Sequence, residues 1–143
     1  ADLELNRDGW LDMIMSHQVE KLLPKNRLVF IYNYPASQAA LAKLNHDEAG
    51  QLIAERFEVY LNGIELANGY HELTNVQEQR ERFEQALHNS DRPIDERLLA
   101  AMEHSHLGLP QCAGVAMGVD RVLMLKLGST SIADVISFDS QRV

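Results

Sequence analysis

Two glutamates lie close together on a segment that the sequence predicts to fold as a β-hairpin. The pair Asn62–Gly63 is a strong short-range signal for a two-residue turn, and it stands inside the run ERFEVYLNGIELANGYHEL, residues 55–73. With this pair at the turn, Glu58 and Glu65 fall on one face as diagonal neighbours, about 7–8 Å apart at Cα. Two carboxylates at that spacing suit Mg²⁺ bound to phosphate oxygens. The alternative is a solvent-exposed pair of glutamates with no ligand.

A basic residue stands out because of its apolar surroundings. The run GVAMGVDRVLML, residues 114–125, is apolar except for Asp120 and Arg121. The pattern predicts Arg121 in the first turn of a helix, where the helix dipole disfavours a cation but favours a bound anion. An arginine there offers two parallel donors to a phosphate; the alternative is an ion pair with an acid at the edge of the core. Gly114 and Gly118 leave room for a flat ligand to approach the backbone.

The strand that follows the turn breaks its alternation at Asn68–Gly69. Glycine inside a strand often marks a β-bulge or a close approach of another backbone. A bulge here turns Glu72 to the same face as Glu65, whereas a regular strand sends the two carboxylates to opposite faces. The sequence alone leaves both arrangements open.

The remaining reactive side chains point to no separate chemistry. Cys112 is the only cysteine, so the chain forms no internal disulfide and lacks the second thiol of a structural zinc site. A lone cysteine is more often a small packing residue than a nucleophile. The histidines His71, His104 and His106 are expected at the surface, without the turn chemistry of a hydrolase triad.

The elements that position these groups follow from periodicity and turn residues. The pattern predicts an amphipathic helix that ends before Pro24, a buried strand, the hairpin, two further helices, a last strand and a buried last helix, at residues 10–22, 28–32, 55–73, 74–87, 93–102, 113–117 and 118–128. Thr74 and Gln77 form a potential capping box, and Pro93 suits the first helical position. This order favours an α+β fold, an antiparallel sheet with flanking helices.

Composition sets the limits on function. The chain has 143 residues, 45% hydrophobic and 24% charged, with a formal net charge of −8, which is ordinary for one globular domain. Its basic residues are scattered, so no nucleic-acid surface is indicated. No apolar run approaches the length of a membrane span and no signal peptide is recognisable, and the single cysteine fits a reducing cytoplasm. The first residue is not Met, so we expect a longer protein.

Four stretches, in order, resemble one known family. They are YPASQAALA, RFEVYLNGIELANGYHEL, the helix containing RFEQ, and GVAMGVDRVLML with its tail IADVISF. Together they resemble the C-terminal part of a class II aminoacyl-tRNA synthetase catalytic domain of the lysyl type, and the last stretch resembles motif 3 of that class. The resemblance runs from Leu28 to the end of the chain.

This resemblance implies an ATP site. Glu58 and Glu65 match the acids that hold Mg²⁺ on the ATP phosphates, and Glu65 with Leu66 would line the nucleotide. Gly118 matches the glycine under the adenosine. Arg121 matches the catalytic arginine that grips the γ-phosphate, so phosphate becomes the expected partner of this cation.

The resemblance also implies a pocket for lysine. Asn68 and Glu72 match residues of that pocket, Glu72 being the acid that receives a substrate ammonium. Ala116 stands where lysyl-tRNA synthetases usually have glycine, and Phe-Asp at residues 138–139 replaces their usual Phe-Pro. With the stretch GLPQCAGVAMGVDR, residues 108–121, these differences resemble the synthetase paralogues that act on translation elongation factor P.

The implied reaction is ATP-dependent activation of (R)-β-lysine as an adenylate and its transfer to a lysine of elongation factor P, with ATP and Mg²⁺ as cofactors. The alternatives are an authentic lysyl-tRNA synthetase, with tRNA as acceptor, or a non-catalytic lysine- or nucleotide-binding module. Nothing in the chain matches motif 1 or motif 2 of the class. Residues 1–143 are therefore expected to be the C-terminal part of a catalytic domain, inactive alone and belonging to a cytoplasmic homodimer.

Overall fold

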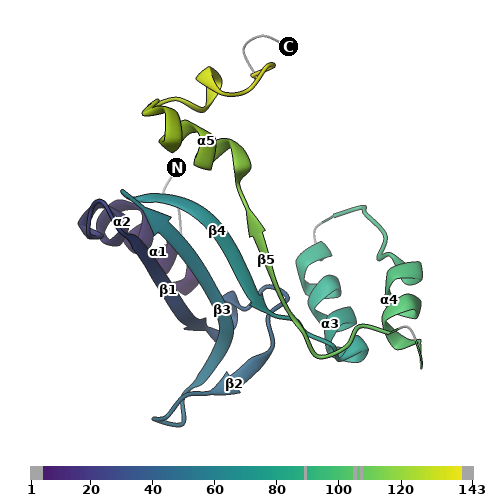
Figure 1. Cartoon of the computed structure of the whole chain (residues 1–143). Coiled ribbons are helices and arrows are strands. Elements are labelled where there is room, and N and C mark those ends of the chain that lie inside the picture. The colour runs from purple at the N-terminus through teal and green to yellow at the C-terminus, as the bar shows by residue number, and fades with distance from the viewer. Residues whose placement is uncertain (1–4, 89, 105, 107, 140–143) are drawn as a thin grey trace. The chain divides into compact units, whose positions relative to one another are not determined.

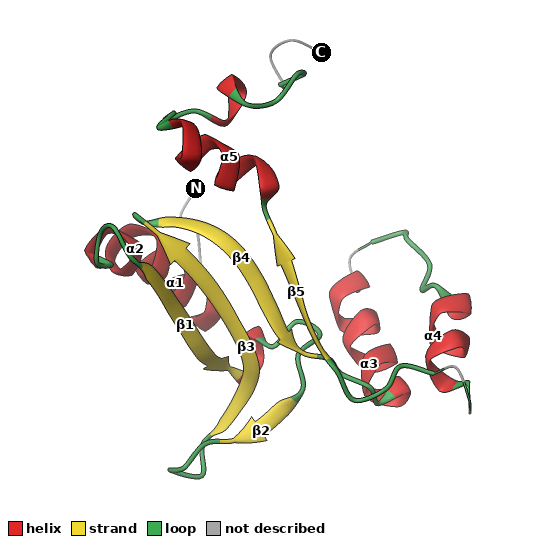
Figure 2. Ribbon diagram, viewed as in Figure 1, coloured by secondary structure: helices red, strands yellow, loops and turns green. Residues whose placement is uncertain are grey.

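The computed structural model describes residues 5–88, 90–104, 106 and 108–139. They form an α+β fold with one five-stranded antiparallel sheet and five α-helices, as the sequence predicted (Figures 1 and 2). The strands are β1 (Leu28–Pro35), β2 (Leu44–His46), β3 (Leu52–Leu61), β4 (Ile64–His71) and β5 (Ala113–Met117). Their order in the sheet is β1-β3-β4-β5, and β2 pairs antiparallel with β3 through Leu44 and Ala54.

The N-terminal helical segment begins earlier than expected. Helix α1 (Arg7–Ile14) is capped by Asn6, whose side chain accepts from the N–H of Gly9, and it continues through a π-helical stretch (Met15–Val19) into α2 (Glu20–Leu22). The expected apolar stripe is present but none of these helical residues is buried. Trp10, for example, is 55% exposed.

Two helices follow β4, and each begins later than predicted. Helix α3 (Val76–Leu87) is capped by Asn75 rather than Thr74. Helix α4 (Glu96–Glu103) begins three residues after Pro93, the predicted first position, and is capped by Asp95. Each cap accepts from backbone N–H groups of the first turn, which satisfies otherwise unpaired donors. Leu99 is the buried residue of α4, whereas Leu98 is 45% exposed.

The last helix, α5 (Val119–Leu127), follows β5 directly, and the 3₁₀ turn Ile132–Asp134 comes after it. Its end agrees with the sequence prediction, because Gly128 takes the left-handed conformation (φ 70°) that glycine adopts without strain. The predicted burial is wrong: Met124 is the buried residue of α5, while Val119 and Leu127 are 73% and 65% exposed.

Strand β1 is likewise less buried than its apolar sequence suggested. It lies at one end of the strand order, and the side chains of Leu28, Phe30 and Tyr32 are all more than half exposed. An apolar run indicates a strand well, but its burial depends on what packs against it. Nothing among the described residues covers this face.

The chain divides into two compact units, which are described separately. Unit 1 comprises residues 1–31, 58–68 and 115–143, and unit 2 comprises residues 32–57 and 69–114. The core of unit 2 is a cluster of three buried alanines packed against partly buried larger side chains: Ala39, Ala42, Ala54, Tyr34, Leu44 and Tyr70. In unit 1, Val59, Tyr60, Leu66 and Met124 are buried.

Candidate functional site

The hairpin turn that carries the two candidate metal ligands lies where the sequence predicted it. Asn62 and Gly63 both have positive φ, 56° and 81°, as the two central residues of a type I′ turn must have. The side chain of Asn62 also accepts from the N–H of Asn26 at 2.7 Å. This contact fixes the tip of the hairpin to the start of the β1 segment.

Glu58 is a buried carboxylate on β3. Its exposed fraction is 9%. Tyr60, two residues along the same face of β3, donates its hydroxyl to Oε2 at 2.6 Å, and the amide of Asn68 lies 3.4 Å from Oε1. Sequence reasoning missed Tyr60 as a partner, although the i, i+2 spacing in a strand indicates a shared face.

Glu65 and Arg121 form the ion pair that explains the cation in the apolar run. Nη1 of Arg121 donates to the main-chain oxygen of Glu65 at 2.8 Å and to its Oε2 at 3.2 Å. The two side chains are 45% and 36% exposed, for arginine and glutamate respectively. The N–H of Gly118 donates to the oxygen of Leu66 at 2.8 Å, which joins the start of α5 to β4. Arg121 therefore pairs with an acid, the alternative left open above.

The contacts of β4 near Asn68 differ from those of a regular two-stranded hairpin. A two-residue turn places Phe57 opposite Asn68, yet a Cβ added at Gly69 would lie 2.7 Å from the Phe57 ring. The side chain of Asn68 instead reaches Glu58. These contacts indicate a β-bulge, the device that lets two residues oppose one and shifts the alternation by one.

Further along, the two strands are joined through the residue before β2. The N–H of Glu55 donates to the main-chain oxygen of Lys43, and the N–H of Lys43 donates to the oxygen of His71, both at 2.9 Å. The contact of 2.6 Å between Oε2 of Glu55 and Nδ1 of His71 therefore spans Lys43 and does not report a direct pairing of β3 with β4. The interpretation of Glu72 as a pocket residue depends on the bulge near Asn68.

The main chain of Glu72 is fixed, whereas its carboxylate has no polar partner in the described part of the chain. Its N–H donates to the oxygen of Cys112 at 2.9 Å, and it forms an antiparallel bridge with Ala42. The residue is half-buried, and its carboxylate makes no hydrogen bond or ion pair within the described part of the chain. A partly buried carboxylate without a partner is a candidate site for a cationic group.

Ala116, predicted for the lysine pocket, and Gly118, predicted for the nucleotide site, are both exposed. Ala116 lies within β5 and Gly118 is the N-cap residue of α5. An added Cβ at Gly118 would meet only the side chain of Arg121, at 3.5 Å or more. The glycine therefore leaves open the surface beside the arginine.

The electrostatic network around Glu55 was not predicted. The side-chain amide of Asn45 donates to its Oε1 at 2.7 Å, while His71 contacts Oε2. The Asn45 hydrogen bond is the main reason that the pKa of Glu55 lies below its ordinary value, partial burial opposes the shift, and His71 and Lys43 add to it. The alternating polar residues of β2 and β3 are the only sequence signal for this network.

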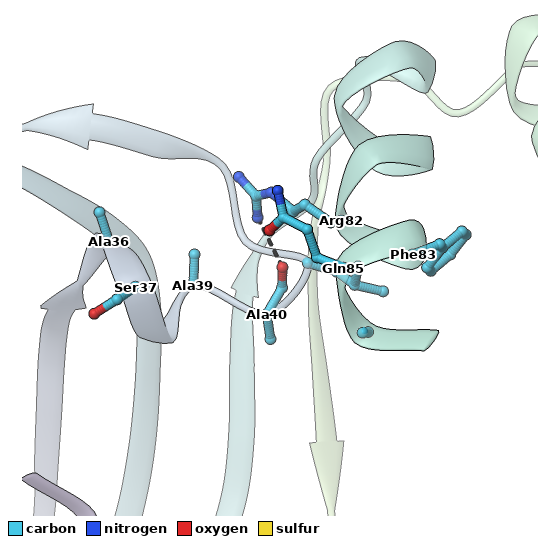
Figure 3. A pocket seen from close by; sticks show the side chains of 9 residues that line it. Ala36, Ser37, Ala39, Ala40, Arg82, Phe83 and Gln85 are labelled. Carbon is cyan, nitrogen blue, oxygen red and sulfur yellow. Dashed lines mark hydrogen bonds between the residues drawn. The ribbon is translucent and has the colours of Figure 1, made fainter. Parts of the chain in front are cut away.

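A pocket in unit 2 contains none of the predicted site residues. Its volume is about 600 Å³, and it lies between the 3₁₀ turn after β1 and helix α3 (Figure 3). Five of its nine lining residues are alanine or serine. The lining consists of Ala36, Ser37, Ala39, Ala40, Leu41, Arg82, Phe83, Gln85 and Ala86. Arg82 is engaged with the oxygens of Ala40 and Ala42 and with Glu78. The pocket therefore offers no free charge to a ligand.

Comparison with known proteins identifies the class. The family model for class II tRNA synthetases of the D, K and N type matches residues 13–142. Together with the antiparallel sheet and the Gly118–Arg121 helix start, this match shows that the chain belongs to the class II tRNA synthetase family.

Three similar curated proteins share one name. The chain is 51% identical to an elongation factor P–(R)-β-lysine ligase of Klebsiella pneumoniae (strain 342), and 48% and 49% identical to proteins of that name from Edwardsiella ictaluri and Salmonella gallinarum. Each alignment covers 99% of this chain but only 44% of the relative. The chain thus spans less than half the length of these relatives. None of the helices in the described ranges has the length and apolar character needed to cross a membrane.

Proposed function

We propose that the chain is part of an enzyme that activates (R)-β-lysine with ATP and transfers it to a lysine of elongation factor P. The observation that carries this proposal is the identity of about half of all positions along 99% of the chain with relatives of that name. In such a reaction the substrate carboxylate attacks the α-phosphorus of ATP and pyrophosphate leaves. The amine of the acceptor lysine then attacks the acyl carbonyl, and AMP leaves.

The phosphate side of this chemistry falls to the residues of the hairpin and α5. Arg121 would exchange the carboxylate of Glu65 for the γ-phosphate, while the main-chain oxygen of Glu65 keeps the guanidinium in place. Gly118 and Leu66 would line the nucleotide. Fixed charges of this kind stabilise a transition state because they need no reorganisation during the reaction.

The residues present fit a magnesium ion. Glu58 and Glu65 supply hard oxygen ligands, and Mg²⁺ typically binds one or two carboxylates together with substrate phosphates. No group of three or more histidine, cysteine, aspartate or glutamate side chains in the described ranges could hold a metal ion, which is compatible with an ion that takes most of its ligands from phosphate and water. When bound, the ion would offset the triphosphate charge.

The amino-acid side falls to Glu72 and Asn68. The unpartnered carboxylate of Glu72 is suited to a substrate ammonium, and Asn68 would add an amide next to the bulge. Ala116 would occupy with its methyl group the space that a glycine leaves for an α-ammonium. It would thereby favour a substrate whose amine lies one carbon further along.

We further propose that residues 1–143 are the C-terminal part of a class II catalytic domain, with motif 3 but without motifs 1 and 2. The 44% share of the relatives supports the partial length, and the resemblance of residues 114–125 to motif 3 supports the C-terminal position. The isolated chain is then expected to form no adenylate, because several charge donors are missing together and one such donor commonly contributes about 10²–10³ in rate. Pyrophosphate exchange by the purified 143-residue chain would contradict this.

The test of the proposed function uses the complete gene product that contains this chain. ATP–pyrophosphate exchange is measured with (R)-β-lysine and with α-lysine, and transfer to elongation factor P is followed by the intact mass of the factor. We expect preferred exchange with (R)-β-lysine and a mass increase of one β-lysyl group.

The family match to D, K and N synthetases favours one alternative, a lysyl-tRNA synthetase. That enzyme would prefer α-lysine and charge tRNA while leaving elongation factor P unmodified. Binding of lysine or nucleotide without any exchange would instead identify a non-catalytic binding module. The same assays therefore separate all three functions, and gel filtration of the complete gene product tests the expected homodimer.

A further inference from the structure

Gly114, on β5, lies directly beneath the carboxylate of Glu72. An added Cβ at Gly114 would overlap Oε1 of Glu72, and the only other atom within 4 Å would be Cδ of the same side chain. Its φ does not lie in the left-handed region, so the conformation of the backbone does not require glycine there. The space above Gly114 is needed for the Glu72 carboxylate alone.

The backbone of Glu72 leaves this carboxylate few other places. The main chain of Glu72 is fixed by a hydrogen bond to Cys112 on one side and by the bridge to Ala42 on the other. Ala42 and Leu73, the residue after Glu72, are 0% and 4% exposed. Only the side-chain torsions of Glu72 can change. Whatever occupies the space above Gly114 therefore decides where the carboxylate lies.

We infer that Gly114 is a positioning residue for the amino-acid substrate: its missing side chain holds the Glu72 carboxylate where it receives the substrate ammonium. This inference rests on the proposed role of Glu72. The sequence suggested that Gly114 lets a flat ligand approach the backbone. The inference assigns it a different role, which is to leave space for the Glu72 carboxylate.

Gly69, on the neighbouring strand, provides the contrast. A Cβ at Gly69 would lie 2.6 Å from the main-chain oxygen of Gly114 and 2.7 Å and 2.9 Å from ring atoms of Phe57. A main-chain oxygen and an aromatic ring cannot move aside easily, whereas the end of a glutamate side chain can. Gly69 is therefore needed for packing and Gly114 for placing a charge.

The two glycines should respond differently to alanine. In the complete gene product, Gly69→Ala is expected to lower the melting temperature by several degrees, because main chain and ring must shift. Gly114→Ala is expected to lower it much less than Gly69→Ala does, because the added Cβ meets only the movable end of the Glu72 side chain. Gly114→Ala should instead raise KM for the lysine substrate about 10- to 100-fold, the usual range for losing a hydrogen bond to a charged group, with KM for ATP unchanged.

Two further readouts separate positioning from general damage. The wild-type protein should reject an analogue that lacks the side-chain ammonium, and Gly114→Ala should lose most of that discrimination. Shortening the acid makes room for the new methyl group, so Glu72→Asp should harm the wild-type background but partly restore lysine KM in Gly114→Ala. Such non-additivity is the signature of two groups in contact.

The outcomes distinguish this inference from the proposed function. If the wild-type protein binds neither α-lysine nor (R)-β-lysine, both are wrong. If it binds one of them and Gly114→Ala leaves KM and the discrimination against the analogue unchanged, the role of Gly114 is wrong and the proposed function stands. A raised KM, lost discrimination and rescue by Glu72→Asp together establish the positioning role.

Discussion

Glu65 and Glu72 lie seven residues apart on one stretch of chain, yet they are held in opposite ways. The carboxylate of Glu65 has a cationic partner, because Arg121 donates to it and to the adjacent main-chain oxygen. The main chain of Glu72 is fixed by hydrogen bonds, and its carboxylate lies next to Gly114. In the described ranges this carboxylate has no polar partner.

This difference suggests different ligands for the two carboxylates. A carboxylate paired with arginine can exchange that partner when a metal ion and a phosphate arrive together, since both charges are then matched again. A half-buried carboxylate without a partner is itself poorly satisfied, and a substrate ammonium would relieve that cost. The hairpin region is thus suited to an anionic ligand with its metal, and the region of Glu72 to a cationic one.

The largest effect is expected at Arg121. Replacing it with alanine removes a preorganised cation from the phosphate side and should lower ATP–pyrophosphate exchange by about 10²–10³. The exposed Arg97 of α4 is the charge-matched control, and its replacement by alanine should leave exchange unchanged. Equal losses in the two variants would show that only overall charge matters.

The next effect concerns Ala116 and substrate choice. Ala116→Gly removes one methyl group, and a steric distinction of that size in a pocket changes specificity by about 10–200-fold. We expect kcat/KM for α-lysine to rise relative to (R)-β-lysine, measured by exchange with both substrates. A constant ratio with slightly lower stability would make Ala116 a packing residue and strengthen the lysyl-tRNA synthetase alternative.

Neutralising Glu72 and neutralising Glu65 should change two different kinetic parameters. Glu72→Gln should raise KM for the lysine substrate about 10- to 100-fold without changing the Mg²⁺ requirement. Glu65→Gln should raise the Mg²⁺ concentration needed for half-maximal exchange without changing lysine affinity, as measured by calorimetry. If both variants change the same parameter, the division into anionic and cationic ligand regions is wrong.

The smallest effect is on stability, at Glu55. Because the folded protein lowers the pKa of this carboxyl, its ionised form stabilises the fold above the pKa of an unfolded glutamate, about 4.3, and this contribution is lost as pH falls through the lower folded value. Glu55→Gln should therefore reduce the free energy of unfolding by about 1 kcal/mol at pH 7.

The pH dependence of that difference is the decisive measurement. Urea titrations of wild type and Glu55→Gln should converge as the pH is lowered from 5 to about 3. The exposed Glu48 provides the control, since Glu48→Gln should change stability little at any pH. A difference between wild type and Glu55→Gln that stays constant over this range would exclude an ionic origin.

Local chemistry made several elements predictable from the sequence. The Asn62–Gly63 turn requires two positive φ angles, which few residues other than asparagine and glycine adopt cheaply. The bounds of β5 and the end of α5 at Gly128 were predicted for similar reasons, and they follow from residues close together in the chain. The resemblance to the class II family, which the family match bore out, also depended on short contiguous motifs.

Tertiary structure alone decided which groups meet. Arg121 pairs with a residue 56 positions away, the extra residue at Asn68 shows itself only through contacts with β3, and the reason for a glycine at position 114 is a carboxylate on another segment. The exposure of apolar residues on β1 and α5 likewise could not be predicted from their sequences. Turns and strand propensities depend on a few neighbouring torsions, whereas burial and pairing depend on what the rest of the chain brings alongside, and no local pattern encodes that.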